Sequence, residues 1–471
     1  MPDYLPKYVS NRGMIAFFVS LAVVNFIFMD NLSSIEFILI GTLEVVTFFY
    51  FGTMASMRWR VLSEKQFIKN LFSVALVLRI VVVTLLYFYY DEKTGIPFDY
   101  HAGDALFYDD IGHYGSYLIK NGNLFIYDEL QKYSGGASRS DMGYPVMLSY
   151  IYFFVGDSIL LSRYVKAILS AWMCVLIYKL AKRNFGEEAG RIAGVMAMLL
   201  PHFLYYCSSQ LKESEMIFLT TLALERADAL LREPRLKLKN VILPLFLALL
   251  LFYFRTVLGA AVLFSLGVAF VFSDNTVLSK HRRWQVAILA VLIALYATSG
   301  LIFNEMEGLY QKQQGGMQQS NYAWRAQTNS FAKYASGAVF APMIFTLPFP
   351  TLAYVPGQEV QMMCSGNNFV KNIMSFFTIF AILMLILKKE WRGHLLIISF
   401  ILAYLVILAL SNFAHSERFH MPSLPAAVIL MSYGITQLNN NNKWLFNAWS
   451  YLMVIAAVGW NFIKLKGRGM I

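Results

Sequence analysis

The sequence predicts an all-α protein that crosses a membrane many times. Hydrophobic residues make up 58% of its 471 residues and charged residues only 14%, whereas soluble domains carry about 25% charged residues. The mean hydropathy is +0.53. Apolar runs of about 17–25 residues, the length of a helix that spans the hydrocarbon core, recur along the chain. Most of the chain is therefore expected to face lipid or other transmembrane helices.

Clusters of Lys and Arg between the apolar runs predict the topology, because such loops usually face the cytoplasm. They are Arg58, Arg60 and Lys65; Lys179, Lys182 and Arg183; Arg232, Arg235, Lys237 and Lys239; Lys280, Arg282 and Arg283; Lys388, Lys389 and Arg392. We expect a bundle of about 12–13 transmembrane helices, at residues 14–30, 35–57, 70–90, 158–180, 189–206, 212–231, 240–254, 256–273, 284–303, 369–388, 394–412, 420–438 and 444–463. The same loops explain the net charge of +11 without a nucleic-acid partner.

This topology divides the chain into four parts. Residues 1–69 form an N-terminal transmembrane hairpin and a cytoplasmic loop, and residues 70–303 form a transmembrane core whose first outer loop is 91–157. Residues 304–368 form a second outer loop, and residues 369–471 form the C-terminal transmembrane helices. The last crossing would place Lys464, Lys466 and Arg468 outside, against the charge rule, so the side of the C-terminus stays open.

The second outer loop ends in an apolar stretch, FAPMIFTLPFPTLAYVPG at residues 340–357. Its prolines disfavour a regular transmembrane helix because each removes a backbone donor and clashes with the preceding turn. We therefore expect this stretch to lie along the membrane surface.

The first outer loop contains a predicted helix from Asp104 to Lys120. Apolar side chains at spacings of four, three and four residues form one stripe, which consists of Phe107, Ile111, Tyr114 and Leu118. Such a helix is expected to lie on the membrane with this stripe facing down. Asp109 and Asp110 fall on the opposite side of the helix and are expected to face water.

Asp104 allows three interpretations on spacing alone. It follows Gly103 and precedes the periodic pattern, so it could be an N-cap that accepts backbone N–H groups. It could instead be a catalytic carboxylate. It could also contribute to a metal site with Asp99 and His101, since carboxylate and imidazole groups bind divalent ions.

Several motifs resemble those of GT-C superfamily glycosyltransferases. In the first outer loop of these enzymes an acid is followed by a Tyr four residues later and a small residue after four more, as in Asp104, Tyr108 and Gly112. Similar motifs are Tyr144-Pro145, Phe154 to Ser158 with Arg163, Tyr178 to Pro201, and ERFHMPSLPAAVIL at residues 417–430. The resemblance is to the branch of aminoarabinose transferases and protein O-mannosyltransferases, which use polyprenyl-phosphate sugars. Ala105 replaces the Glu that follows the acid in O-mannosyltransferases, which argues against a protein acceptor.

The resemblance implies transfer of one sugar from a polyprenyl phosphate to an acceptor hydroxyl at the outer membrane face. Asp104 would be the base, and one carboxylate suffices for an inverting displacement. Cationic side chains would bind the phosphate and stabilise its negative charge, so neither a divalent metal nor another cofactor is expected. The candidate substrate-binding residues are Tyr108, Lys212, Glu213, Arg255, His415, Arg418 and His420.

Each of these residues also has a structural alternative. Arg255 and Lys212 could extend to the membrane interface, and the two histidines could be ordinary interfacial residues. Glu213 could contact sugar hydroxyls or pair with Lys212.

The expected location is the cell membrane, of the bacterial inner-membrane type, with the active site facing the non-cytoplasmic side. The expected partners are the polyprenyl-phosphate sugar donor, a glycan, lipid-linked or protein acceptor, and membrane lipids. Two alternatives remain: a transporter or flippase of lipid-linked saccharides, and a surface-polysaccharide polymerase or ligase. A transporter would favour internal repeats and charges in a central cavity, whereas the acids here gather in outer loops. A polymerase or ligase would favour arginines in a large outer loop.

Overall fold

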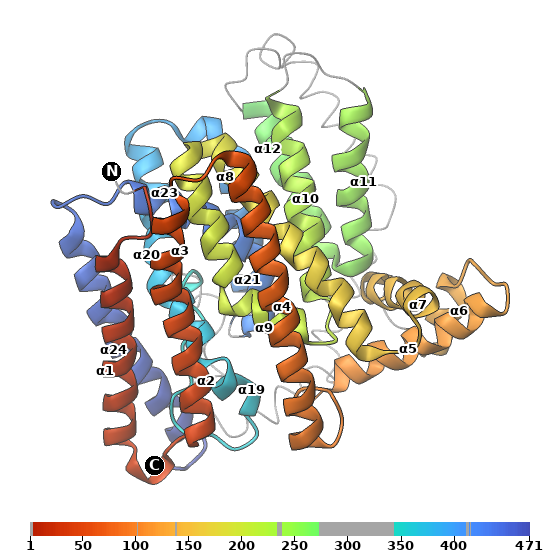
Figure 1. Ribbon diagram of the computed structural model, residues 1–471, viewed down its shortest axis with the longest axis horizontal. Coiled ribbons are helices and arrows are strands. Elements are labelled where there is room, and N and C mark those ends of the chain that lie inside the picture. Colours follow the sequence, from red (N-terminus) through yellow and green to blue (C-terminus); the bar gives the residue numbers. More distant parts are fainter. Residues whose placement is uncertain are drawn as a thin grey trace.

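The computed structural model describes residues 3–100, 102–136, 139–232, 238–272, 343–410, 414 and 416–471. These residues form a bundle of helices (Figure 1) and contain no strand, only an isolated bridge between Leu32 and Ala353. Seven helical segments are long and apolar enough to cross a membrane, which confirms an all-α polytopic membrane protein. They are Lys7–Ile27, Ile35–Trp59, Glu64–Thr94, Ile159–Leu199, Ser365–Leu387, Trp391–Ala409 and Lys443–Lys466.

The N-terminal part runs along the bundle three times. It consists of α1 (Lys7–Ile27), then α2 (Ile35–Val46) and α3 (Gly52–Trp59) joined by a π-helical turn, and then α4 (Glu64–Thr94). Ser63 and Gln66 form a capping box at the start of α4, which satisfies backbone donors that the first helical turn leaves free. Gly95 ends α4 with φ at 77°, a left-handed conformation that glycine adopts without strain.

Helix α8 (Ile159–Leu199) is a hairpin of two arms. Gly186, with φ at 89° and ψ at 173°, interrupts the helix, and the Tyr178 hydroxyl donates across the bend to Glu187 at 3.0 Å. The expected runs 158–180 and 189–206 lie on the two arms, the second of which continues into α9 (Pro201–Ser208).

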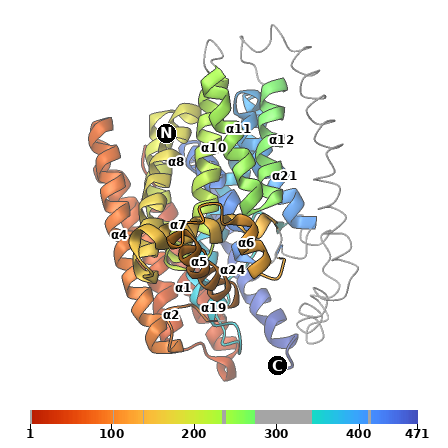
Figure 2. The ribbon, with the colours of Figure 1, turned by 90° about the vertical axis from the view of Figure 1, so that its right-hand side faces the viewer.

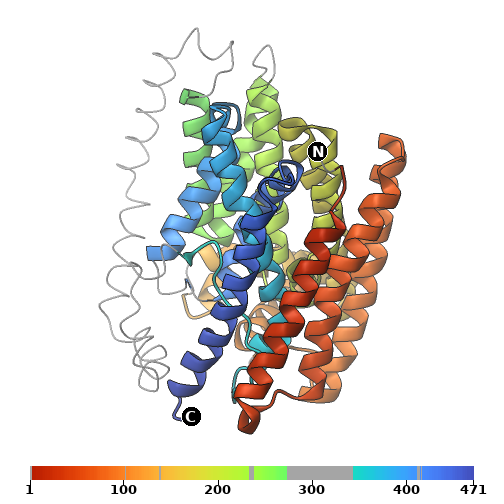
Figure 3. The same cartoon turned by 90° about the vertical axis from the view of Figure 1, so that its left-hand side faces the viewer.

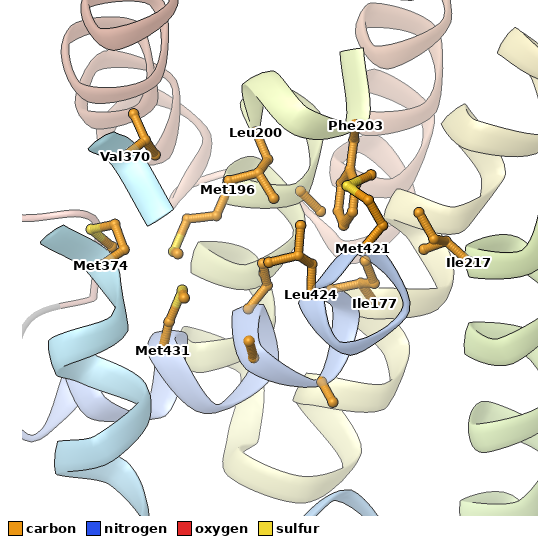
Figure 4. Close-up of a cluster of buried hydrophobic side chains, with 14 of the residues drawn as sticks. Ile177, Met196, Leu200, Phe203, Ile217, Val370, Met374, Met421, Leu424 and Met431 are labelled. Atoms are coloured by element: carbon orange, nitrogen blue, oxygen red, sulfur yellow. The ribbon is translucent and has the colours of Figure 1, made fainter. Parts of the chain in front are cut away.

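The following helices are α10 (Glu213–Leu231), α11 (Leu238–Phe254) and α12 (Thr256–Phe272). A single residue, Arg255, separates α11 from α12, as the sequence predicted. The C-terminal part consists of α19 (Glu359–Met363), α20 (Ser365–Leu387), α21 (Leu395–Leu410), α22 (Glu417–His420), α23 (Leu424–Thr436) and α24 (Lys443–Lys466). Figure 4 shows the methionine-rich core between α8, α9, α20 and α23, with Met196, Met374 and Met431 side by side.

The described basic loops lie at one end of the bundle. Arg191 donates to the carbonyl of Trp59 at 2.8 Å, and Arg232 donates to the carbonyl of Gly393 at 3.3 Å. This gathering agrees with the expected topology. The crossing at 284–303 and the basic residues Arg235, Lys237, Lys280, Arg282 and Arg283 lie outside the described residues.

The two termini lie at opposite ends of the bundle (Figure 3). The C-terminal end of α24 is therefore opposite the basic loops, although it carries Lys464, Lys466 and Arg468. Lys464 donates to Thr351 at 2.6 Å and to Gln358 at 2.8 Å. These hydrogen bonds give the cation a structural role at this end of the molecule.

The expectation that the proline-containing stretch lies along the membrane surface is wrong. Residues 344 and 346–353 are buried between α20 and α24 rather than spread over lipid. Asn372 of α20 donates to the carbonyl of Pro348 at 2.9 Å, and Asn461 of α24 donates to that of Pro350 at 3.0 Å. Asn461 also accepts the backbone N–H of Leu352 at 2.9 Å. These amides satisfy a non-helical backbone that would otherwise be costly to bury.

Three short helices lie across the bundle at the end opposite the basic loops (Figures 1 and 2). They are α5 (Gly103–Lys120), α6 (Tyr127–Tyr133) and α7 (Gly143–Val155). The predicted α5 is therefore present, within one residue of its expected start. It packs closely against α7, because a Cβ atom at Gly112 would lie 2.9 Å from the Leu148 side chain.

The face that α5 buries overlaps the predicted apolar stripe only in part. Its small residues, together with Tyr108 and two isoleucines, are buried: Ala105, Tyr108, Ile111, Gly112, Gly115, Ser116 and Ile119. Phe107, from the predicted stripe, is 39% exposed. From the same stripe, Ile111 is buried, and Tyr114 and Leu118 pack against its hydrophobic cluster. The orientation of the stripe towards the membrane stays a prediction.

Candidate functional site

Asp104 does not cap α5. The N-cap position is Ala102, and no side chain caps this helix end. Asp104 lies in the first turn of α5, where its carboxylate accepts a hydrogen bond from Nη1 of Arg418 at 2.5 Å. Its side chain is 63% exposed. The N-cap interpretation is therefore wrong, and Asp104 is a solvent-accessible carboxylate that reaches a distant segment of the chain.

Arg418 connects the surface helix α5 to the core helix α10. Its Nε donates to Oε1 of Glu213, the buried first residue of α10, while Nη1 bonds Asp104. Arg255, between α11 and α12, places Nη2 3.7 Å from the same Glu213 oxygen. The result is a chain of alternating charges, with one exposed carboxylate at its end and one buried carboxylate between two guanidinium groups.

The elements around Arg255 hold its guanidinium group in place. It lies 4.4 Å from the centre of the Phe419 ring, a favourable cation–π arrangement. Nη1 donates to the Tyr404 hydroxyl at 3.5 Å, and that hydroxyl donates to the Phe419 carbonyl at 2.9 Å. Because Phe419 follows Arg418 in the chain, Tyr404 of α21 helps position both arginines.

The electrostatic surroundings keep Arg418 charged. Burial alone would lower the pKa of its guanidinium group, but the negative charges of Glu213 and Asp104 raise that pKa well above its usual value. A charge-assisted donor of this kind binds carboxylate or phosphate oxygens strongly.

Lys212 lies in the same region and pairs with a residue that sequence reasoning missed. Its ammonium group donates to the Asp141 carboxylate and to the Ser140 carbonyl, the latter at 3.4 Å. Burial lowers the pKa of Lys212, while Asp141 opposes this shift. Lys212 therefore pairs with Asp141, and the ion pairs of Glu213 are with Arg418 and Arg255.

Tyr108 forms part of the wall of the site. Its ring lies 6.0 Å from the Lys212 ammonium group and packs edge-on against Tyr144 at 5.3 Å. Burial raises the pKa of its hydroxyl, so this group stays protonated and can donate a hydrogen bond.

Of the two candidate histidines, His420 is not part of this cluster. His420 is buried and its Nε2 lies 2.7 Å from the Ala414 carbonyl. It lines a separate small pocket that also includes Lys371, Thr378, Leu405 and Met431. His415 lies outside the described residues.

Asp109 and Asp110 differ from each other, contrary to expectation. Asp109 is half-buried, accepts a hydrogen bond from the Tyr152 hydroxyl of α7 and lies 3.4 Å from Nε2 of His113. Burial raises the pKa of its carboxyl group. The prediction that Asp109 faces water is therefore wrong, whereas Asp110 is exposed and accepts only from Tyr133, at 3.2 Å, among the interactions of the described residues. The sequence contained a signal for this burial. Gly112 and Gly115 allow α7 to approach closely on the side of α5 that carries Asp109.

Arg163 and Asp99 border the site. Arg163, buried in α8, donates to the Pro97 carbonyl at 2.6 Å and lies 5.5 Å from the Phe98 ring. Burial raises the pKa of Asp99 to about 6, against the opposing effect of Arg163 and Arg418. His101, the third member of the alternative metal site, lies outside the described residues. Within those residues, no group of three or more His, Cys, Asp or Glu residues is arranged so that it could hold a metal ion.

The sequence thus identified five residues that the structure brings together: Asp104, Tyr108, Glu213, Arg255 and Arg418, with Lys212 adjacent through Tyr108. Chemically, the arrangement offers cationic donors for an anion beside an exposed carboxylate. Searches of protein-family models, curated proteins and solved structures found no match to this chain.

Proposed function

We propose that this protein is a membrane glycosyltransferase that moves a sugar from a polyprenyl-phosphate donor to an acceptor hydroxyl at the end of the bundle that carries α5–α7. The observation that carries the proposal is the contact of Asp104 with Arg418, which links the first outer loop to a segment more than three hundred residues later in the chain. Buried Glu213 and Arg255 extend that contact. This end of the bundle is opposite the described basic loops, which supports an active site on the non-cytoplasmic side.

In the proposed reaction, Asp104 accepts the proton of the acceptor hydroxyl as its oxygen attacks the anomeric carbon. The bond between that carbon and the phosphate oxygen breaks, and its electron pair remains on the lipid phosphate. Arg418, Arg255 and Lys212 bind the negative charge that develops there. A single carboxylate at the reaction centre favours inversion of the anomeric configuration.

The direct test is a transfer assay with purified protein. Polyprenyl-phosphate sugars carrying a radioactive hexose or pentose are incubated with membrane extracts as acceptors, and the label is followed into product. We expect transfer with at least one sugar by the wild-type protein and its loss in Arg418→Gln. Release or movement of intact donor lipid across vesicle membranes, without transfer of the sugar, would instead support a flippase.

A further inference from the structure

We propose that Asp104 and the phosphate of the lipid donor compete for Arg418, so that donor binding itself releases the base. This inference rests on the proposed function and concerns how its site is controlled. It follows from the unequal exposure of the two carboxylates that share the Arg418 guanidinium group.

Glu213 is the permanent partner of Arg418. It is buried, and its Oε1 also lies 3.7 Å from Arg255. Removing a guanidinium group from this oxygen would leave a buried negative charge without full compensation, which is strongly unfavourable. The Nε side of Arg418 therefore stays bound to Glu213 when a ligand arrives.

Asp104 is the exchangeable partner. Its side chain is 63% exposed, so water can solvate the carboxylate as soon as it leaves Arg418. Ion pairs of exposed side chains contribute little net free energy. The phosphodiester of the donor carries one negative charge and two unesterified oxygens, so it can replace Asp104 at Nη1, as can the isoprenyl monophosphate that transfer releases.

The exchange has a chemical consequence. While Asp104 is bound to Arg418, one of its carboxylate oxygens accepts the Nη1 hydrogen bond and is occupied by that contact. When the donor phosphate replaces Asp104 as the acceptor of the Nη1 hydrogen bond, both oxygens of the Asp104 carboxylate are free. The carboxylate then lies beside the sugar that the same phosphate carries. The base would thus be released only when the donor is present, and the donor would bind before the acceptor.

If the exchange occurs, removing the negative charge of Asp104 should strengthen the binding of phosphate. Asp104→Asn removes the competing charge and should tighten binding of a short-chain isoprenyl monophosphate by about 2- to 5-fold, since an exposed ion pair is worth up to about 1 kcal/mol and 1.4 kcal/mol is tenfold in affinity. Asp104→Ala should act in the same direction. Isothermal titration of the purified, full-length protein in detergent measures both, with the uncharged isoprenyl alcohol as ligand control.

Asp110→Asn is the matched control, because it removes the same charge from an exposed position on the same helix. Its affinity for the monophosphate should equal that of the wild type. If the monophosphate binds the wild type but neither Asp104 variant binds it more tightly, the exchange is wrong and the proposed donor class stands. If tightening is equal in Asp110→Asn, the effect is general electrostatics and the exchange is also wrong. Failure of the monophosphate to bind the wild type contradicts the donor class itself.

Discussion

Both ends of the bundle contain networks of ion pairs, but the carboxylates around Arg183 are buried, whereas one of the two carboxylates around Arg418 is exposed. At the basic end, Arg183 of α8 bonds Glu225 at 2.5 Å and Asp228 at 3.1 Å. Asp228 also accepts from Arg232 and Asn184, each at 3.1 Å. Both acids are buried in α10, and each oxygen of Asp228 has a partner.

At the opposite end, the chain of charges ends in exposed Asp104. Buried acids with several partners hold helices together, since removing one partner leaves charges without compensation. An exposed acid contributes little to stability and remains available to a ligand. The comparison therefore separates a structural network from a site, although the residue types are the same. Four measurements test this distinction between the two networks.

The largest effect is expected for Asp104→Asn. This change keeps the size of the side chain but removes the proton acceptor, so transfer should fall by about 10²–10⁴-fold, the usual contribution of general base catalysis. Radiolabel transfer measures the rate, and the thermal unfolding midpoint should not change. Near-normal transfer would show that another carboxylate is the base. Asp110→Asn should retain activity, whereas Asp109→Asn is no suitable control because Asp109 bonds Tyr152.

A smaller effect is expected for Arg418→Lys. Lysine keeps the positive charge but cannot bond Glu213 and a second anion with one planar group. The KM for the donor should rise by about 10- to 100-fold, which corresponds to loss of a hydrogen bond between charged groups. Steady-state kinetics at varied donor concentration separate this rise from a change in kcat. An unchanged donor KM would remove Arg418 from the phosphate site.

Asp228→Asn tests the structural network. It should lower the free energy of unfolding by about 1–3 kcal/mol, less than for a fully buried pair because Arg183 and Arg232 are partly exposed. Transfer by the folded protein should be unchanged. Denaturant titration in detergent measures the first quantity and the transfer assay the second. A loss of transfer without a loss of stability would show that the basic end also serves the reaction.

The smallest effect is expected for chelators. If cationic side chains alone bind the leaving phosphate, treatment with EDTA should leave the transfer rate unchanged. Loss of activity that manganese or magnesium restores would give Asp99, His101 and Asp104 a metal-binding role.

The sequence predicted those features that depend on neighbouring residues. The apolar runs gave the helices, down to the separation of α11 and α12 at Arg255, and helical spacing gave α5. Prediction from the sequence was incomplete or wrong where contacts between distant segments determine the packing. The stripe of large apolar residues gave only part of the buried face of α5, because the close approach of α7 at Gly112 depends on tertiary structure. Asp141 was missed because its partner Lys212 is 71 residues away.

The predicted position of the proline-containing stretch was wrong for the same reason, because distant segments determine where it packs. Its composition correctly excluded a transmembrane helix, but its position depends on side-chain amides from α20 and α24. Neither Asn372 nor Asn461 is marked by its local sequence as a partner of residues 346–353.

The dependence of this stretch on α24 has a consequence for biosynthesis. Asn461 supplies hydrogen bonds to Pro350 and Leu352, and α24 also packs beside α1, where the Tyr8 hydroxyl donates to the Lys443 carbonyl at 3.3 Å. Helix α1 and residues 346–353 therefore complete their packing only after α24, the last helix of the chain, has been synthesised. Until α24 enters the bilayer, the backbone groups of Pro350, Leu352 and Ala353 lack the hydrogen bonds of Asn461, and such unpaired groups are costly within a membrane.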